Sequence, residues 1–403
     1  MITTITTLVG QVLAITAFSL VGIIIHRITR IEQSLACAIA GVIAGFAIVT
    51  FNFDTGIRAN NIHDIVFYLI LPVLIFEAAW NLHLKTLRQW LIPILVFATV
   101  GVLISGFVSA GLIFIGVGIE SGFPWMAALL TGAILSATDP VAVSTQLKKL
   151  NAPESLTTLF EGESLFNDAT AVVFFSIILA LIIPNDAHHS TGINYFLLVF
   201  FGGLIVGAII GLLGSSLVLF IQDSSASQFI LVFIAFTSFY VAEHLLHVSG
   251  ILAVMMTAIV IKMTLSEVEH TVARGITGTW NWLGLYFNSL LFMLMGLTLT
   301  FSMFKEMWLA MIIAIVATLV ARTIAISTCS YVTKFIDPIT KEWQILLIWG
   351  GLRGAIAIAL VLSLPTELDY WWVIQSMVFG VVVFSMLVQS TTFPFILKRL
   401  KDK

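Results

Sequence analysis

Apolar runs of about twenty residues recur along almost the whole chain, and this recurrence restricts the fold more than any other feature. A helix needs about 20 apolar residues to cross a hydrocarbon core of about 30 Å. Within lipid, helices satisfy their own backbone N–H and C=O groups, which irregular chain cannot do. Of the 403 residues, 60% are hydrophobic and only 10% are charged, whereas soluble domains carry about 25% charged residues. The sequence therefore predicts an all-α polytopic membrane protein.

Thirteen membrane spans can be drawn on this basis. No segment outside them is long enough to bury a core of its own, so residues 1–403 form a single transmembrane domain without a soluble domain. The first apolar run lacks a basic start and a cleavage site, and is therefore a span and not a signal peptide. The predicted spans are 3–25, 34–51, 62–82, 90–118, 124–147, 155–183, 194–221, 226–247, 249–264, 279–301, 306–332, 343–364 and 370–396.

The basic residues are distributed unevenly between the two sides. The loops after even-numbered spans hold only Arg58 and Lys305. Because Lys and Arg stay on the cytoplasmic side, the N-terminus is expected outside and the C-terminus in the cytoplasm. The loops after odd-numbered spans and the C-terminal tail hold Arg27, Arg30, Lys85, Arg88, Lys148, Lys149, Lys262, Arg274, Lys334, Lys341, Lys398, Arg399, Lys401 and Lys403.

Two spans are predicted to be interrupted. The fifth carries Pro140 near its middle, and proline removes a backbone donor and clashes with the preceding turn. The twelfth carries Gly350, Gly351 and Gly354 around Arg353. The fifth and twelfth spans are seven apart, so they cross the membrane in opposite directions. Two inverted six-helix repeats joined by a connector would give this arrangement. Interrupted helices in corresponding positions of two halves indicate a substrate site near the middle of the membrane.

The sixth span contains three carboxylates, Glu161, Glu163 and Asp168. A charge at membrane depth costs from ~2.5 to over 10 kcal/mol, so such residues usually serve an ion or proton pathway. Residues four apart share a helix face, which places Ser164 beside Asp168 and Asn167 beside Glu163. Asp168 is the best candidate to bind a cation or a proton, because burial brings the two into competition for its carboxylate. The alternative is that the carboxylates pair with basic residues of other helices.

The interruptions supply further candidate ligands. At the fifth span, Thr138 offers a hydroxyl and a free carbonyl to a monovalent cation, so Asp168, Thr138 and Ser164 form the predicted cation site. Asp139 is placed to neutralise the positive ends of the half-helices, or to act simply as a helix cap. Arg353 is expected to offset the negative helix ends where the twelfth span breaks. Arg322, in the eleventh span, needs a carboxylate partner, and Glu163 is the first candidate.

Other features exclude several classes of function. Cys37 and Cys329 both lie in apolar spans and suggest neither a disulfide framework nor a zinc site, and a net charge of −3 gives no reason to expect nucleic acid. An intramembrane aspartyl protease would carry a Gly-x-Gly-Asp signature, which is absent, and a channel would need a repeated filter. No cofactor is expected and the chain is not predicted to be an enzyme. Glu77 and Glu243 could line access funnels or lie near helix ends.

Four motifs, in this order and spacing, resemble the sodium/proton exchangers of the cation/proton antiporter-1 group. They are LPVLIFEAAWNLHLKTLR ending at Arg88, GAILSATDPVAV at 132–143, EGESLFNDATAVV at 161–173 and GGLRGAIAIAL at 350–360. The resemblance implies thirteen helices in inverted repeats, crossed and unwound helices five and twelve, a homodimer and an elevator-like cycle. Transport helices would fall in about 90–183 and 306–396, with the remaining helices forming the scaffold and dimer contacts.

Residue by residue, the resemblance implies that Asp168 binds the cation or proton with Asn167 beside it, and that Thr138 contributes a carbonyl and Ser164 a hydroxyl. Asp139 would add a water-mediated or dipole-balancing contact. An Asn-Asp pair in place of two aspartates resembles the electroneutral members, which exchange one cation for one proton.

The expected substrate is Na⁺, with Li⁺ or K⁺ as alternatives, and a K⁺/H⁺ antiporter or a cation channel as rival readings. The chain is expected in a plasma membrane, as a multi-pass protein in contact with the lipid bilayer, and bacterial from its brevity. It ends about seven residues after the last span, so regulation by a long cytoplasmic tail is not expected.

Overall fold

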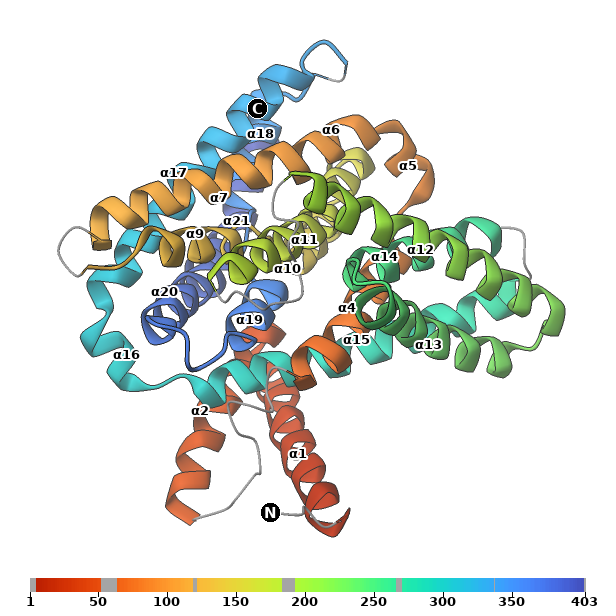
Figure 1. The fold of residues 1–403 in the computed structure, drawn as a ribbon, viewed down its shortest axis with the longest axis horizontal. Helices are drawn as coiled ribbons and strands as arrows, with labels where there is room; N and C mark the ends of the chain where they lie inside the picture. Colours follow the sequence, from red (N-terminus) through yellow and green to blue (C-terminus); the bar gives the residue numbers. More distant parts are fainter. Residues whose placement is uncertain are drawn as a thin grey trace.

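The computed structural model describes residues 5–51, 64–118, 122–182, 193–265, 270–336 and 338–401. In these ranges every regular element is a helix (Figure 1). Each of the thirteen predicted spans coincides with a helix or with a helix that changes its hydrogen bonding or breaks along its length. Among the described residues, seven helices are long and apolar enough to cross a membrane uninterrupted. The all-helical prediction is therefore confirmed.

The helices fall into two halves of the chain. The first half contains α1 (Ile5–Thr29), α2 (Gln33–Phe51), α4 (Leu71–Asn81), α5 (Leu84–Gln89), α6 (Leu91–Val96), α7 (Val102–Ile113), α9 (Trp125–Ile134), α10 (Val141–Lys149) and α11 (Glu154–Ile182). The second contains α12 (Ile193–Ile221), α13 (Ser224–Tyr240), α14 (Gly250–Thr264), α15 (His270–Thr298), α16 (Phe301–Glu306), α17 (Trp308–Thr333), α18 (Lys341–Trp349), α19 (Ala355–Leu362), α20 (Trp371–Phe384) and α21 (Ser390–Lys401).

Several long helices contain a π-helical segment, in which one extra residue fits into a turn. Such segments leave backbone groups free of the usual i→i−4 pattern and often lie near functional sites. They extend a neighbouring α-helix and do not end the span. The π-helical segments are η1 (Ile65–Ile70), η2 (Phe97–Gly101), η3 (Phe114–Gly118), η4 (Val241–Leu245) and η6 (Ser385–Gln389).

Two groups of helices flank the interrupted pair (Figure 1). On one side, α12 packs on α14, and α4 packs on α14 and α15. On the other side, α17 packs on α7 and α20, and α7 packs on α9. The helices α10, α11 and α19 lie between these groups in Figure 1. The elements that carry the candidate site are therefore central to the molecule and have helices on both sides.

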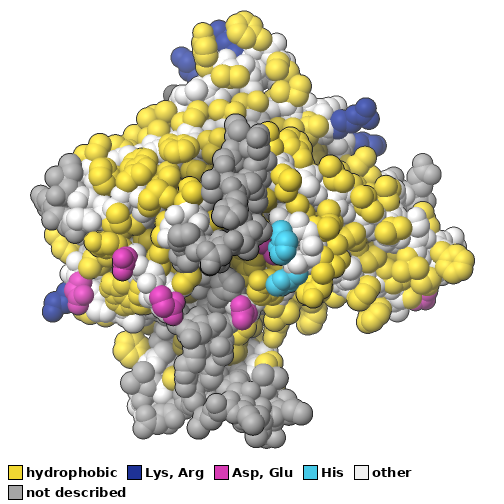
Figure 2. Space-filling view, in the orientation of Figure 1, with side chains coloured by type: hydrophobic (Ala, Val, Ile, Leu, Met, Phe, Trp, Pro, Cys, Tyr) yellow, Lys and Arg dark blue, Asp and Glu magenta, His cyan; other side chains and the backbone are white. Residues whose placement is uncertain are grey.

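The outer surface is the kind that a bilayer requires. Figure 2 shows a face covered largely by hydrophobic side chains, with Lys and Arg gathered mainly along its upper and right-hand margins. Large side chains such as Phe46, Phe220 and Phe335 are exposed. Water-soluble monomers rarely expose apolar patches beyond a few hundred Å², so this surface fits contact with lipid.

Candidate functional site

Both predicted interruptions are present, and they touch each other. Helix α9 ends at Ile134 and α10 begins at Val141, while α18 ends at Trp349 and α19 begins at Ala355. Between the two breaks, the Asp139 backbone N–H donates to the Leu352 carbonyl over 2.8 Å. Four half-helix ends therefore meet in the interior of the protein, where their orphan N–H and C=O groups need partners.

One carboxylate serves two of these ends. Asp139 Oδ1 accepts from the Val141 N–H (2.9 Å), at the start of α10. Its Oδ2 accepts from the Ala355 N–H (3.4 Å), at the start of α19. A carboxylate at a helix N-terminus both caps it and balances its positive dipole end. Asp139 thus lies where the sequence places it, against the N-terminal ends of both broken helices.

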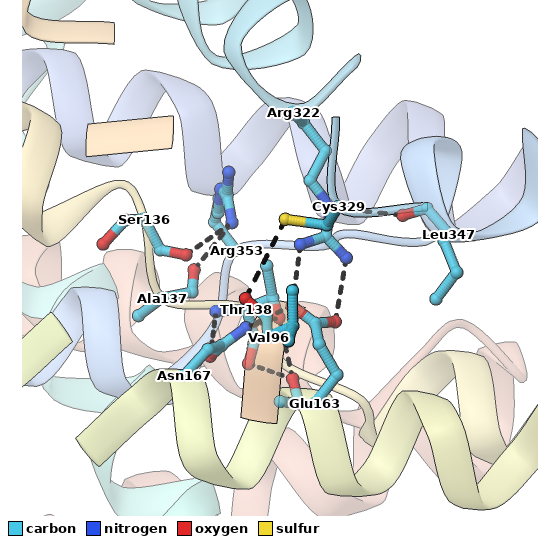
Figure 3. A network of polar contacts seen from close by, with 11 residues as sticks. Val96, Ser136, Ala137, Thr138, Glu163, Asn167, Arg322, Cys329, Leu347 and Arg353 are labelled. Atoms are coloured by element: carbon cyan, nitrogen blue, oxygen red, sulfur yellow. Dashed lines mark hydrogen bonds and ion pairs between the residues drawn. The ribbon is translucent and has the colours of Figure 1, made fainter. Parts of the chain in front are cut away.

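The two arginines donate to carbonyls at the C-terminal ends of the broken helices. Which arginine binds which end differs from the prediction. Arg353 Nη1 donates to the carbonyls of Ser136 (3.2 Å) and Ala137 (2.9 Å), at the C-terminal end of α9 (Figure 3). We expected Arg353 to offset the end of its own span, which is wrong. At that end the Leu347 carbonyl accepts from Arg322 Nε (3.2 Å). The reason is geometric, because the two spans cross at their breaks and the Arg353 side chain, which lies within one break, reaches the carbonyls of the other.

Glu163 and Arg322 form a buried, bidentate ion pair. Arg322 Nη1 donates to Glu163 Oε1 over 2.7 Å and Nη2 to Oε2 over 2.9 Å. Only 1% of Glu163 and 6% of Arg322 is exposed. The planar guanidinium matches a carboxylate in this geometry. Glu163, the first candidate partner of Arg322 in the sequence, is thus in contact with it.

The side chain of Asn167 ties α11 to the break of the fifth span. Its Nδ2 donates to Glu163 Oε1 (2.8 Å) and to Thr138 Oγ1 (2.6 Å), and its Oδ1 accepts from the Thr138 N–H (3.2 Å). Ser164 Oγ lies 2.8 Å from Thr138 Oγ1 and also donates to the Thr138 carbonyl. Two hydrogen bonds of the Asn167 amide therefore hold Thr138 in place, and the third connects it to Glu163.

Asp168 differs from its neighbours because it lacks such contacts. Only 8% of the residue is exposed, and among the described residues its buried Oδ1 has no hydrogen-bond partner. It lines a cavity of ≈ 280 Å³ together with Thr138 and Asp139. A buried polar atom without a partner is rare in native proteins and calls for an explanation such as a bound ion, water or proton. The carboxylate is thus free to take a ligand that arrives through this cavity.

The remaining carboxylates of the sequence prediction lie elsewhere. Glu161 pairs with Lys148 of α10 at 2.7 Å, in a contact whose lysine is about half exposed, as the alternative of simple pairing expects. Glu77 lines the same cavity as Asp168 and accepts from Asn81 Nδ2 (2.6 Å). Glu243 lines a separate cavity of ≈ 170 Å³ beside α11 and caps α14 through the Gly250 N–H (2.8 Å).

One cavity residue escaped the sequence reasoning. Glu32, in the loop between α1 and α2, lines the cavity that contains Asp168. It lies outside every apolar run, so it carries none of the energetic cost that identifies a carboxylate at membrane depth. The only sequence signal is its position in a short connection between two spans.

Gly354 permits the close approach of Asp139, and this gives a testable consequence. A Cβ at this position would overlap the Asp139 carboxylate, whereas a Cβ at Gly278 of α15 meets nothing within 4 Å. Gly354→Ala is expected to destabilise the protein by about 1–3 kcal/mol through overpacking. Gly278→Ala should be neutral or slightly stabilising, because alanine favours helix more than glycine does. Thermal unfolding of the two variants in detergent tests this, and equal transitions would contradict it.

Comparison with known proteins places this geometry in a family. The family described as "Sodium/hydrogen exchanger, transmembrane" matches residues 14–399. The low-affinity Na⁺/H⁺ antiporter NhaS1 of Synechocystis is 32% identical over 380 residues, covering 92% of this chain and 70% of that protein. The Na⁺/H⁺ antiporter NhaH of Halobacillus aidingensis is 31% identical over 407 residues, covering 97% of each.

A solved structure has the same fold. The sodium proton antiporter MjNhaP1 of Methanocaldococcus jannaschii superposes with a TM-score of 0.83 over 99% of both chains, at 18% sequence identity. That likeness extends across all the helices described above. Together with the family match over nearly the full length, it leads to one conclusion. The chain is a multi-pass membrane protein of the sodium/hydrogen exchanger family, a family of transporters and not of enzymes.

Proposed function

We propose that this protein is a secondary active transporter that exchanges Na⁺ for H⁺ by competition at Asp168. The observation that carries the proposal is the Oδ1 of Asp168, which is buried at a cavity and has no hydrogen-bond partner among the described residues. The relatives named above are described as Na⁺/H⁺ antiporters, which favours Na⁺ over Li⁺ and K⁺. The cation ligands are the Asp168 carboxylate, the Thr138 carbonyl and the Ser164 hydroxyl, all of them hard oxygen donors.

The charges at the site support an electroneutral exchange. The cluster contains three carboxylates, of Asp139, Glu163 and Asp168, and two guanidinium groups, of Arg322 and Arg353, so it carries a net charge of −1 when all are ionised. Glu163 and Asp139 are engaged by Arg322 and by helix ends. The remaining negative charge is that of Asp168, and binding of either one Na⁺ or one H⁺ makes the loaded site neutral.

Competition at one carboxylate is sufficient to couple the two flows. The protonated or cation-loaded site crosses, whereas the empty charged site pays the cost of a buried charge and does not. Raising the proton concentration on one side should therefore raise the apparent KM for Na⁺ on that side. Helices within 90–183 and 306–396 form the moving unit in this proposal. The other helices form a scaffold that also makes the contacts of a homodimer.

Two cavities on different parts of the scaffold boundary support alternating access. The larger one lies between Asp168 and residues of α4 and α15. The smaller one lies between α11 and the η4–α14 connection. We assign the larger cavity to the cytoplasmic side, because it adjoins the α1–α2 loop. This loop carries Arg30 and follows Arg27 in the last turn of α1, and basic residues stay on the cytoplasmic side. On that basis the C-terminus lies in the cytoplasm, and the membrane is the plasma membrane expected from the sequence.

Reconstitution tests the proposal directly. Proteoliposomes with a preset proton gradient and a pH-sensitive dye would receive Na⁺, Li⁺ or K⁺ in separate additions. We expect dequenching with Na⁺, a KM for Na⁺ that rises as the pH falls, and no change of rate when valinomycin and K⁺ clamp the voltage. Dequenching by K⁺ alone would reassign the substrate. A cation current without proton movement would favour a channel, and the absence of any response from folded protein would overturn exchange altogether.

A further inference from the structure

Helix α20 continues into the π-helical segment η6, which carries two buried polar residues. Ser385 and Gln389 are only 1% and 3% exposed. Ser385 Oγ donates to Gln389 Oε1 over 2.8 Å. Burying polar groups is costly unless they form hydrogen bonds, and π-helical segments often lie near functional sites. The remaining contacts of these two side chains therefore indicate what the segment does.

Together the two side chains hold both ends of the break in the twelfth span. At its start, Gln389 Nε2 donates to the carbonyl of Trp349, the last residue of α18, over 3.0 Å. Near its end, the Arg353 N–H donates to Ser385 Oγ over 3.3 Å. One chain of hydrogen bonds thus runs from the Arg353 N–H through Ser385 and Gln389 to the Trp349 carbonyl. The thirteenth span therefore fixes how far apart the two ends of the break lie.

The backbone anchor matters for Arg353, because its guanidinium has few contacts of its own. Its Nη1 donates to the carbonyls of Ser136 and Ala137 (Figure 3), whereas its buried Nε and Nη2 have no hydrogen-bond partner among the described residues. The Arg322 guanidinium, by contrast, is held at two points by Glu163. We therefore expect the Arg353 guanidinium to shift with its backbone when the anchor is lost.

The contact made by Arg353 reaches the proposed cation site. Ala137, whose carbonyl accepts from Arg353 Nη1, directly precedes Thr138, whose own carbonyl is a proposed ligand of Na⁺. Peptide groups are planar and rigid, so a shift of the Ala137 carbonyl displaces that of Thr138. Groups that orient the ligands of a metal ion typically change its affinity 10- to 100-fold when they are removed.

We propose that Gln389 and Ser385 are positioning residues of the cation site. They hold the break of the twelfth span so that Arg353 can hold the break of the fifth. This inference rests on the proposed exchange and adds to it two residues that do not line the cavity of Asp168. Their loss should weaken the binding of Na⁺ through the Thr138 carbonyl, while the Asp168 carboxylate stays in place.

The test uses the full-length protein in proteoliposomes at alkaline pH, where few protons compete for Asp168. Gln389→Met keeps the length of the side chain, but it cannot donate to the Trp349 carbonyl and offers Ser385 only a weak sulfur acceptor. We expect the KM for Na⁺ to rise about tenfold with kcat retained. Gln375→Met is the matched control, because Gln375 of α20 is also buried, at 7% exposed, but makes none of these hydrogen bonds.

Ser385→Ala provides a second variant that does not depend on the folding of Gln389→Met. It removes a single hydroxyl and breaks the chain at the Arg353 N–H, so the KM for Na⁺ should rise here too. Residues of one hydrogen-bond network are not independent. The rise in the double variant should therefore be smaller than the product of the two single rises.

Binding can also be measured without transport. Because a ligand of the folded state raises the Tm, Gln389→Met in detergent should need about tenfold more Na⁺ than the wild type for the same stabilisation. An unchanged KM in both single variants beside an active wild type would overturn positioning and leave the exchange proposal intact. A fall in kcat at unchanged KM would overturn it as well, because it indicates a structural role only. A wild type without exchange would overturn both.

Discussion

Na⁺/H⁺ exchange is expected to vanish when Asp168 is replaced by asparagine. The amide has nearly the shape of the carboxylate, yet it can neither take up a proton nor balance the charge of a cation. Asp168 is also the residue of the site whose buried oxygen lacks a partner among the described residues, so no neighbour is positioned to replace it. In the proteoliposome assay, Asp168→Asn should give the dequenching of protein-free liposomes at every Na⁺ concentration.

The fold of this variant should be preserved. Replacing a buried charge by a neutral group removes a desolvation cost, so the thermal transition of Asp168→Asn should equal or exceed that of the wild type. Asp369→Asn serves as the matched control, because Asp369 is exposed between α19 and α20 and should exchange normally. Substantial Na⁺ flux driven by a pH gradient in folded Asp168→Asn would contradict the assignment of Asp168 as the residue that binds the cation and the proton.

The largest effect on stability is expected at the pair of Glu163 and Arg322. Glu163→Gln leaves the Arg322 guanidinium buried without a counter-charge, which typically costs about 3–5 kcal/mol. Arg322→Gln should cost a similar amount, because it strands the carboxylate instead. Thermal unfolding in detergent, followed by tryptophan fluorescence, would measure both losses.

The pair of Lys148 and Glu161 is the matched control. It has the same 2.7 Å separation, but its lysine is about half exposed whereas both groups of the Glu163–Arg322 pair are buried, so water can partly replace the contact. Lys148→Gln should therefore shift the transition less than Glu163→Gln or Arg322→Gln does. The double variant Glu163→Arg with Arg322→Glu should recover part of the loss, short of the full amount because Asn167 also donates to Glu163. No recovery in the double variant would contradict the proposed energetic role of the pair.

The sequence was most informative where the bilayer imposes a cost. The spans follow from apolar length alone, and the breaks follow from Pro140 and from the glycines around Arg353. Arg322 could be assigned to Glu163 because each is a charge at membrane depth in need of a partner. These inferences depend on one element at a time, or on a single pair, and need no knowledge of how the helices are arranged.

Arrangement in three dimensions accounts for what could not be predicted. The partner of Arg353 depends on how the two broken spans cross, and one break reaches the carbonyl groups of the other. Glu32 resembles an ordinary loop charge between Arg30 and Gln33, and only the folded chain turns it into the cavity. That one Asp139 carboxylate caps two half-helices likewise depends on their ends meeting.

The buried ion pair of Glu163 and Arg322 has a further consequence for energy conversion. With those two charges cancelled, the proposed carrier is neutral in both loaded states, and the membrane potential exerts no net force on either crossing. A cycle that moved one net charge would gain or lose about 2.3 kcal/mol per 100 mV. This protein would instead stop when the ratio of Na⁺ across the membrane equals the ratio of H⁺, at any voltage. A depolarised cell with an intact pH gradient would thus lose none of its capacity to expel sodium.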